Sequence, residues 1–297
     1  MTPLTHLQAL ESESIAILRD GVAEARNPVL LFSGGKDSTV LAHLAAKAFY
    51  PSPPPVPLLH VDSTWEFPEV LAFRDRFAAD YGFKLVVHHN VDGRRRGLNP
   101  IEHGGLYTTV MRTEALKQAL DEGGYDVIFG GARRDEEATR AKERVVSVRN
   151  KLHGWDPKNQ RPELWALYNW RRAPGQTLRV FPLSNWTEQD LWTYIARENL
   201  PLCPLYFAAP RPVVEMARKL IVIGDPEQAQ MLGFGDSQTR RVRFRSLGCW
   251  PVTAADPSDA ADLKAVLKET LFAFVSERSG RVSDGGSLEA QKREGYF

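Results

Sequence analysis

The sequence has 297 residues, of which 43% are hydrophobic and 25% are charged, and its formal net charge at pH 7 is +1. A chain of this length can bury one large core, and its nearly neutral charge gives no reason to expect nucleic acid or a membrane as a partner. The two cysteines, Cys203 and Cys249, lie far apart in the sequence and predict neither a zinc site nor a disulfide framework. Residues 1–26 lack an apolar core of the signal-peptide type and no stretch approaches a membrane span, so we expect a cytoplasmic protein.

Hydrophobic periodicity predicts alternating helices and strands over the first two thirds of the chain. Apolar residues at helical spacing predict an amphipathic helix over residues 4–25, which Asn27-Pro28 ends. The other predicted elements are strands over 29–32, 58–62, 84–88, 125–129 and 178–181, and helices over 41–48, 70–81, 113–120 and 188–195. Strands that alternate with helices in this way predict an α/β fold with a parallel, doubly wound sheet.

A glycine-rich loop joins the first strand to the following helix, with the sequence Ser33-Gly34-Gly35-Lys36-Asp37-Ser38. Glycines let a ligand approach the backbone closely, and a helix start offers unpaired N–H groups that suit a phosphate. The serine hydroxyls and the lysine ammonium add donors, so we interpret these six residues as an ATP and pyrophosphate site rather than an ordinary turn. The spacing is not that of a Walker P-loop, and it resembles the S-G-G-x-D-S loop of ATP pyrophosphatases.

Two further strand ends carry candidate ligand contacts. Asp62 stands at the carboxyl end of the second strand, where open α/β sheets bind ligands. Gly130 and Gly131 end the fourth strand, and Arg133 and Arg134 follow, whose guanidinium groups match phosphate and sulfate geometry. Because two glycine turns with charged residues occur at equivalent strand ends, we interpret Gly130 and Gly131 as ATP-binding residues rather than as a helix start with surface charge.

The amino-acid composition changes after residue 211. Val213 to Ile223 predict a short helical stretch, and a further helix is expected over 263–274. Arginines that alternate with apolar residues over 240–245 predict an extended segment with one basic face. This face could bind an anion, meet an acidic partner or be a solvated edge, and Arg243 and Arg245 are candidates for binding the acceptor. Residues 276–297 are polar and glycine-rich and would be disordered on their own. We therefore divide the chain into a nucleotide-binding domain over 1–211 and a partly irregular extension over 212–297 that would contact substrate or a partner.

Several segments together resemble one family, the small catalytic subunit of the bacterial two-subunit sulfate adenylyltransferase (ATP sulfurylase). This family lies within the superfamily of ATP pyrophosphatases and PAPS-reductase-like proteins, so the resemblance implies an adenine nucleotide α-hydrolase-like fold. The resemblance runs nearly end to end, and it is carried by residues 130–137, 155–165, 181–190 and 242–251 and the final Gly-Tyr-Phe. The glycine-rich loop alone would indicate only the superfamily.

The resemblance implies that ATP and sulfate give adenosine 5′-phosphosulfate and pyrophosphate, with Mg²⁺ as cofactor. It also implies a GTPase as the large subunit. This chain has no G-x-x-x-x-G-K-[ST] of its own, so that GTPase would be a second polypeptide. The catalytic candidates are Lys36, Arg133 and Arg134, of which the arginines would hold the α-phosphate or the acceptor. Asp37 would order the loop or hold Mg²⁺ through water. Asp62 would lie near the nucleotide.

The chain departs from the family pattern at Gly34, Glu66 and residues 105–108, where the family usually has isoleucine, lysine, and a serine and histidine. These departures leave open a relative that adenylates another oxyanion. Two rival hypotheses are a sulfur-transfer ATP pyrophosphatase and a non-catalytic nucleotide-sensing subunit. The nearly neutral charge speaks against the pyrophosphatase if its substrate is RNA, and the intact loop speaks against the sensing subunit. A homo-oligomer is left open.

Overall fold

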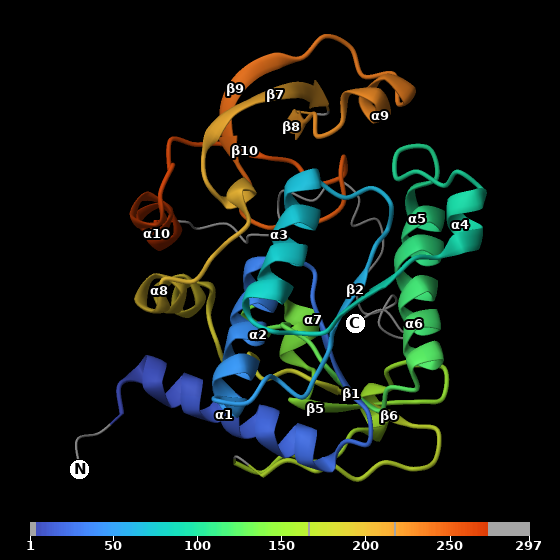
Figure 1. Cartoon of the computed structure of the whole chain (residues 1–297), viewed down its shortest axis with the longest axis vertical. Coiled ribbons are helices and arrows are strands. Elements are labelled where there is room, and N and C mark those ends of the chain that lie inside the picture. The colour runs from blue at the N-terminus through green and yellow to red at the C-terminus, as the bar shows by residue number, and fades with distance from the viewer. Residues whose placement is uncertain (1–3, 166, 217, 273–297) are drawn as a thin grey trace.

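The computed structural model describes residues 4–165, 167–216 and 218–272, and its centre is a six-stranded sheet in the order β3-β2-β1-β4-β6-β5 (Figure 1). β5 (Val146–Arg149) is the edge strand and pairs antiparallel with β6. The other strands run parallel to one another: β1 (Pro28–Leu31), β2 (Leu58–Val61), β3 (Leu85–His88), β4 (Val127–Phe129) and β6 (Thr177–Val180). The predicted α/β, doubly wound fold is confirmed, with the correction that the sheet is mixed rather than wholly parallel.

β5 was missed in the sequence because its two valines alternate with Ser147 and Arg149, which do not look like core residues. The Arg149 guanidinium is nevertheless buried, and it forms an ion pair with the buried Glu143. The outer edge of β5 donates backbone N–H groups to the side chains of Gln160 and Glu163. These side chains occupy positions that another strand would take, and so protect the edge.

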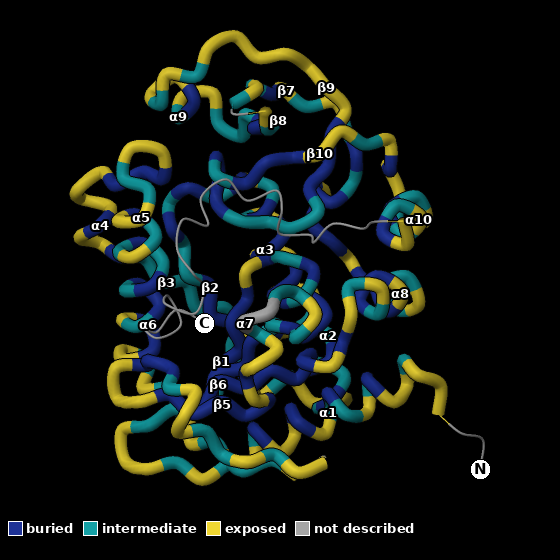
Figure 2. Tube along the Cα trace, turned by 180° about the vertical axis from the view of Figure 1, so that it is seen from behind, coloured by how far each residue is buried: buried dark blue, intermediate teal, exposed yellow. Residues whose placement is uncertain are grey.

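Helices cover both faces of the sheet (Figure 1). α6 (Ala115–Gly123) packs on one face over the smaller apolar cluster. The helices on the other face pack over the larger cluster and are α1 (His6–Glu24), α2 (Lys36–Phe49), α3 (Pro68–Asp80) and α8 (Glu188–Glu198). Capping boxes at Thr5 and Thr187 begin α1 and α8, and the second of these is the helix predicted over 188–195. Figure 2 shows β1, β5 and β6 as part of the buried centre.

Short helical segments join these elements. α4 (Val91–Arg95), α5 (Gly104–Tyr107) and the π-helix η1 (Thr108–Glu114) lead into α6. The remaining segments are η2 (Arg134–Glu136), α7 (Ala138–Ala141), η3 (Pro157–Asn159) and η4 (Pro204–Tyr206). No helix in the described ranges has the length and apolar character needed to cross a membrane.

The prediction of a helical stretch over Val213–Ile223 is wrong. The chain there forms a hairpin of β7 (Ala209–Met216) and β8 (Lys219–Val222), because its β-branched residues favour a pleated strand over a helix. A second sheet has the order β10-β9-β7-β8 and lies at one end of the molecule (Figure 1). Its other elements are β9 (Gln238–Arg243), β10 (Asp256–Pro257) and the neighbouring α9 (Pro226–Met231) and α10 (Leu263–Leu271).

The extended segment predicted around residue 240 is therefore β9. The division of the chain at residue 211 stays a prediction, and β7 begins two residues before it, at Ala209. The predicted tail over 276–297 and the end of the predicted helix over 263–274 lie outside the described residues.

Candidate active site

The glycine-rich loop turns the chain from β1 into α2. Gly34 has a φ of +74°, in the left-handed region that suits glycine, and a Cβ there would lie 3.0 Å from Cγ1 of Val70. The Ser38 hydroxyl donates to the Gly35 carbonyl oxygen at 2.9 Å and lies 3.3 Å from the Ser33 hydroxyl oxygen. The loop is thus shaped by its own backbone and hydroxyl groups. Gly35 at the N-cap position offers no side chain, so the first N–H groups of α2 need other acceptors.

The second glycine turn packs directly against this loop. β1 and β4 are parallel neighbours, so their carboxyl ends meet at one edge of the sheet. A Cβ on Gly131 would lie 3.1 Å from the carbonyl carbon of Asp37 and 3.2 Å from the amide nitrogen of Ser38. Only glycine fits this approach of two backbones without a shift. The structure therefore brings together the two glycine turns that the sequence predicts as ligand contacts.

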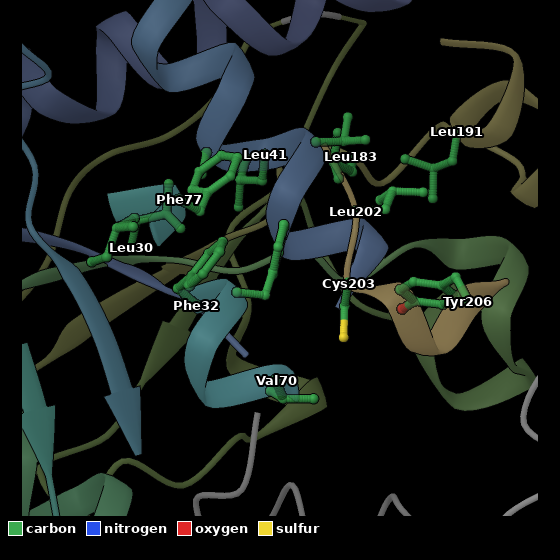
Figure 3. Close-up of a cluster of buried hydrophobic side chains, with 14 of the residues drawn as sticks. Leu30, Phe32, Leu41, Val70, Phe77, Leu183, Leu191, Leu202, Cys203 and Tyr206 are labelled. Atoms are coloured by element: carbon green, nitrogen blue, oxygen red, sulfur yellow. The ribbon is translucent and has the colours of Figure 1, made fainter. Parts of the chain in front are cut away.

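An open cavity of about 200 Å³ lies between these turns and a third segment, residues 246–249, which follows β9. The polar part of its wall includes Ser33, residues 35–38 and the backbone of Gly130 to Ala132, together with charged side chains described below. The apolar part comes from the strand ends and from helices on both faces, through Leu31, Phe32, Leu59, Val61, Val70 and Leu116. Figure 3 shows Phe32 and Val70 within the buried hydrophobic cluster that lies behind the apolar part of the cavity wall. A wall of this kind suits a ligand with a flat apolar ring at one end and phosphates at the other.

Asp37 is held between two cations. Its Oδ1 accepts a hydrogen bond from Arg133 Nε at 2.6 Å, and its Oδ2 lies 3.5 Å from Lys36 Nζ. Burial on its own would raise the pKa of the Asp37 carboxyl, but Lys36 and Arg133 outweigh it and hold that pKa well below its ordinary value of 3.8. The carboxylate therefore stays ionised and ties the start of α2 to the turn after β4.

The two arginines that the sequence analysis proposes for the phosphates lie behind the cavity wall. The Arg133 side chain is fully buried under the loop, where it bonds Asp37. Arg134 turns away, with its guanidinium donating to Oδ1 of Asn185 at 2.6 Å and lying 3.9 Å from Oε2 of Glu163. Neither side chain lines the cavity. In this arrangement Arg133 can act on a ligand through the loop that it supports.

The other predicted contacts are also displaced from the wall. Asp62 accepts a hydrogen bond from the Thr64 amide at 2.8 Å, and the neighbouring Val61 lines the cavity in its place. Arg243 is buried and donates to Glu269 at 2.7 Å. The Arg245 side chain donates to Glu188 at 3.3 Å, whereas its backbone carbonyl oxygen lies 3.5 Å from Lys36 Nζ. The segment that carries Arg245 thus reaches the site with its backbone.

The side chains that line the cavity without having been assigned from the sequence include Arg112, Arg140 and Tyr206. Burial lowers the pKa of Arg140, but the carboxylates of Glu136 and Glu137 at 2.9 and 3.2 Å raise it overall, so the guanidinium keeps its charge. In the sequence, nothing distinguishes Arg140 from the other basic residues that follow Arg134. Arg112 projects from the π-helix η1, a kind of irregularity that is frequent at functional sites, and no sequence signal marks it.

Among the described residues, no group of three or more His, Cys, Asp or Glu side chains could hold a metal ion. Asp37 is the carboxylate within the glycine-rich loop, and both of its oxygens already face cations. Mg²⁺ commonly keeps several waters and binds proteins through one or two carboxylates and substrate phosphates. These residues therefore fit a metal that arrives on a nucleotide and contacts the protein through water.

A mixed α/β sheet with two glycine turns at one edge defines a class of nucleotide-binding protein, and residues 27–255 match the family described as the phosphoadenosine phosphosulfate reductase domain. The FMN adenylyltransferase of Candida glabrata, solved with FAD and inorganic pyrophosphate, shares the fold, with a TM-score of 0.52 at 15% identity over 86% of this chain and 71% of that chain.

Two curated relatives are both named sulfate adenylyltransferase subunit 2. The relative from Caulobacter vibrioides is 57% identical over 99% of this chain and 96% of its own length. The relative from Geotalea daltonii is 57% identical over 99% of both chains. This chain belongs to the family of sulfate adenylyltransferase subunit 2, and the resemblance drawn from the sequence is confirmed.

Proposed function

We propose that this chain is an enzyme that transfers AMP from ATP to sulfate, giving adenosine 5′-phosphosulfate and pyrophosphate. The observation that carries the proposal is the 57% identity, over nearly the whole of both chains, to relatives that bear this enzyme's name. The cavity supports it independently, since a phosphate-binding loop faces an apolar wall across one open space. The departures from the family pattern do not outweigh this identity.

In the proposed reaction a sulfate oxygen attacks the α-phosphorus of ATP while the bond to the bridging α–β oxygen breaks. The adenine would lie against Leu59, Val61 and the other apolar residues of the wall. The leaving pyrophosphate would take hydrogen bonds from the loop N–H groups and from Ser33 and Ser38, with Lys36 as its nearest cation. Such a reaction asks little covalent chemistry of the protein, so positioning and charge neutralisation would supply the rate.

The acceptor would enter from the side of residues 246–249 and Arg112, opposite the loop. Arg112 and Arg140 are the arginines whose side chains reach the cavity wall in the described structure, so we assign them the charge-balancing role that we expected of Arg133 and Arg134 from the sequence. Glu66 lies on the same wall, where Ser63 donates to its Oε1 at 2.6 Å. Mg²⁺, bound through the ATP phosphates and water, would neutralise part of the phosphate charge.

The name of the relatives supports a partner, because a protein called subunit 2 belongs to an assembly with a larger or different subunit. We propose that this partner is a GTPase and that its hydrolysis of GTP drives the unfavourable adenylyl transfer. This chain contains no Walker P-loop of its own in its 297 residues, so the GTPase would be a second polypeptide.

The test is pyrophosphate release from ATP and Mg²⁺ with sulfate as acceptor, measured with this chain alone and with the purified partner subunit and GTP. Parallel reactions with phosphate and selenate would report the acceptor range. Release that depends on sulfate is the expected result. Release with another anion but not with sulfate would reject the acceptor and keep adenylyl transfer, and no release with any anion would reject the activity.

A further inference from the structure

One residue from the C-terminal half of the chain contacts the glycine-rich loop at the first backbone N–H group of α2. The Lys36 amide, the first of α2, donates to the hydroxyl oxygen of Tyr206 at 2.8 Å. Tyr206 lies in η4, 170 positions further along the chain. A Cβ on Gly35 would lie 3.4 Å from the same hydroxyl, so the loop backbone passes directly beside it. The phenol therefore stands where an anion at the start of α2 would accept that hydrogen bond.

The hydroxyl has a proton that this hydrogen bond does not use. A phenol both donates and accepts, and here its oxygen accepts from Lys36. No acceptor for its proton occurs among the described residues, and Tyr206 lines the cavity between the loop and residues 246–249. Burial raises the pKa of Tyr206 strongly, with Asp37 adding to the effect and Lys36 opposing it, so the group remains a hydrogen-bond donor at neutral pH.

The ring is fixed by the surrounding core. Its centroid lies 5.6 Å from that of Trp192, with the two planes at 84°. Figure 3 shows Tyr206 at the margin of the buried cluster that contains Leu202 and Cys203. The carbonyl oxygen of Leu205 accepts from the amide of Phe244 at 2.9 Å, which joins η4 to the segment after β9. A rigid ring holds the hydroxyl at one place before a ligand arrives, which lowers the entropic cost of using it.

We infer that Tyr206 is a binding residue for the leaving pyrophosphate. Its hydroxyl oxygen accepts a hydrogen bond from the first N–H of α2, and its own proton is donated to a pyrophosphate oxygen. The hydroxyl therefore links the start of α2 to the ligand through two consecutive hydrogen bonds. This inference rests on the proposed function, because it takes the loop to be the pyrophosphate site. It adds a contact from outside the glycine-rich loop to the group that leaves in the reaction.

The test compares the wild-type chain with Tyr206→Phe, which removes only the hydroxyl. The matched control is Tyr194→Phe, the same change at a buried tyrosine of α8 that does not line the cavity. Calorimetry in Mg²⁺ measures the dissociation constants of pyrophosphate and of AMP for each protein, and thermal unfolding checks that each variant is folded. A hydrogen bond to a charged ligand predicts that Tyr206→Phe weakens pyrophosphate binding about tenfold, with AMP affinity within about twofold of wild type. Tyr194→Phe should change neither dissociation constant.

Unchanged pyrophosphate affinity in Tyr206→Phe would overturn the inference. An equal loss of pyrophosphate and AMP affinity would also overturn it, since the tyrosine would then only maintain the shape of the cavity. A wild-type chain that binds AMP but no pyrophosphate would reject the assignment of the loop itself, and the inference with it. The affinity measurements need neither sulfate nor a partner subunit, so the inference can hold even if the proposed acceptor is wrong.

Discussion

Arg133 Nε donates to Asp37 Oδ1 at 2.6 Å, and this bond joins the two glycine turns across 96 positions of sequence. The Arg133 side chain is fully buried, and the Asp37 side chain is 21% exposed at the cavity. The pair therefore presents one carboxylate to the site and conceals the cation that orients it. Arg133 contributes to the site by fixing the backbone against which a phosphate would bind.

The first prediction concerns the strength of this pair. Asp37→Asn should lower the free energy of unfolding by about 3 kcal/mol, because it removes the carboxylate that bonds the buried Arg133 guanidinium at 2.6 Å. Urea denaturation measures the change. The matched control is Arg134→Gln at the position after Arg133, where the side chain is 35% exposed and its removal should cost less than about 1 kcal/mol. Equal costs for the two variants would show that the pair does not hold the loop.

The second prediction is the pH dependence of the same pair. The folded-state pKa of Asp37 lies below its unfolded value, so the folded state binds fewer protons and the stabilisation is fully present above about pH 4. It is lost as the pH falls below that value towards the folded-state pKa. Between about pH 5 and pH 3 the wild-type chain should therefore lose more unfolding free energy than Asp37→Asn, in which this group no longer titrates. Parallel losses would contradict the assignment.

The third prediction tests the left-handed turn of the loop. Gly34→Ala should lower the unfolding free energy by more than about 1 kcal/mol, since alanine is strained at a φ of +74° and its Cβ would meet Val70 at 3.0 Å. Gly82 has a φ of +69° with nothing within 4 Å, so Gly82→Ala isolates the backbone strain alone. ATP affinity should fall only in Gly34→Ala. If the two variants lose equal stability and keep ATP affinity, the close contact with Val70 does not shape the loop.

The sequence predicts well those helices and strands whose spacing of apolar residues matches the faces that the fold buries. α2 has its apolar residues at helical spacing next to a strand that is apolar throughout, so both were predictable. The hairpin of β7 and β8 was missed because the spacing of its apolar residues also fits a helix, although their β-branching favours a strand. Its identity is decided by the long-range pairing of β7 with β9, which no local pattern contains.

The candidate site also has features that the sequence predicts and features that it does not predict. Both glycine turns were predictable, since they end strands that any parallel sheet places at one edge. The direction of an arginine side chain was not predictable from its position. Arg133 and Arg140 both follow the second glycine turn, yet the Arg133 side chain lies buried beneath the loop and Arg140 lies at the cavity wall. Tyr206 was missed because its contact with Lys36 spans 170 positions.

The fourth prediction concerns a buried cation away from the cavity. Arg179 lies in β6, and within the described part of the chain none of its three guanidinium nitrogens has a hydrogen-bond partner. Burial, together with the neighbouring Arg149, lowers its pKa to about 9. Arg179→Met should therefore raise the unfolding free energy by about 1 kcal/mol or more. Arg149→Met, which removes an ion-pair partner of buried Glu143, should instead lower it, and a loss of stability in both variants would indicate that Arg179 is satisfied.

The last prediction addresses Lys36, whose side chain is only 1% exposed although it lines the cavity. Lys36→Met keeps most of the volume and removes the charge that would balance the leaving pyrophosphate, so turnover should fall at least about 100-fold with the fold intact. Lys47→Met on the same helix is the control, because Lys47 pairs with Glu11 and Glu198 at 2.7 and 3.2 Å outside the cavity. Pyrophosphate release and circular dichroism report activity and folding. A Lys36→Met variant as active as Lys47→Met would mean that the charge of the loop lysine does not act on the transferred phosphates, and the backbone amides would then have to carry the site alone.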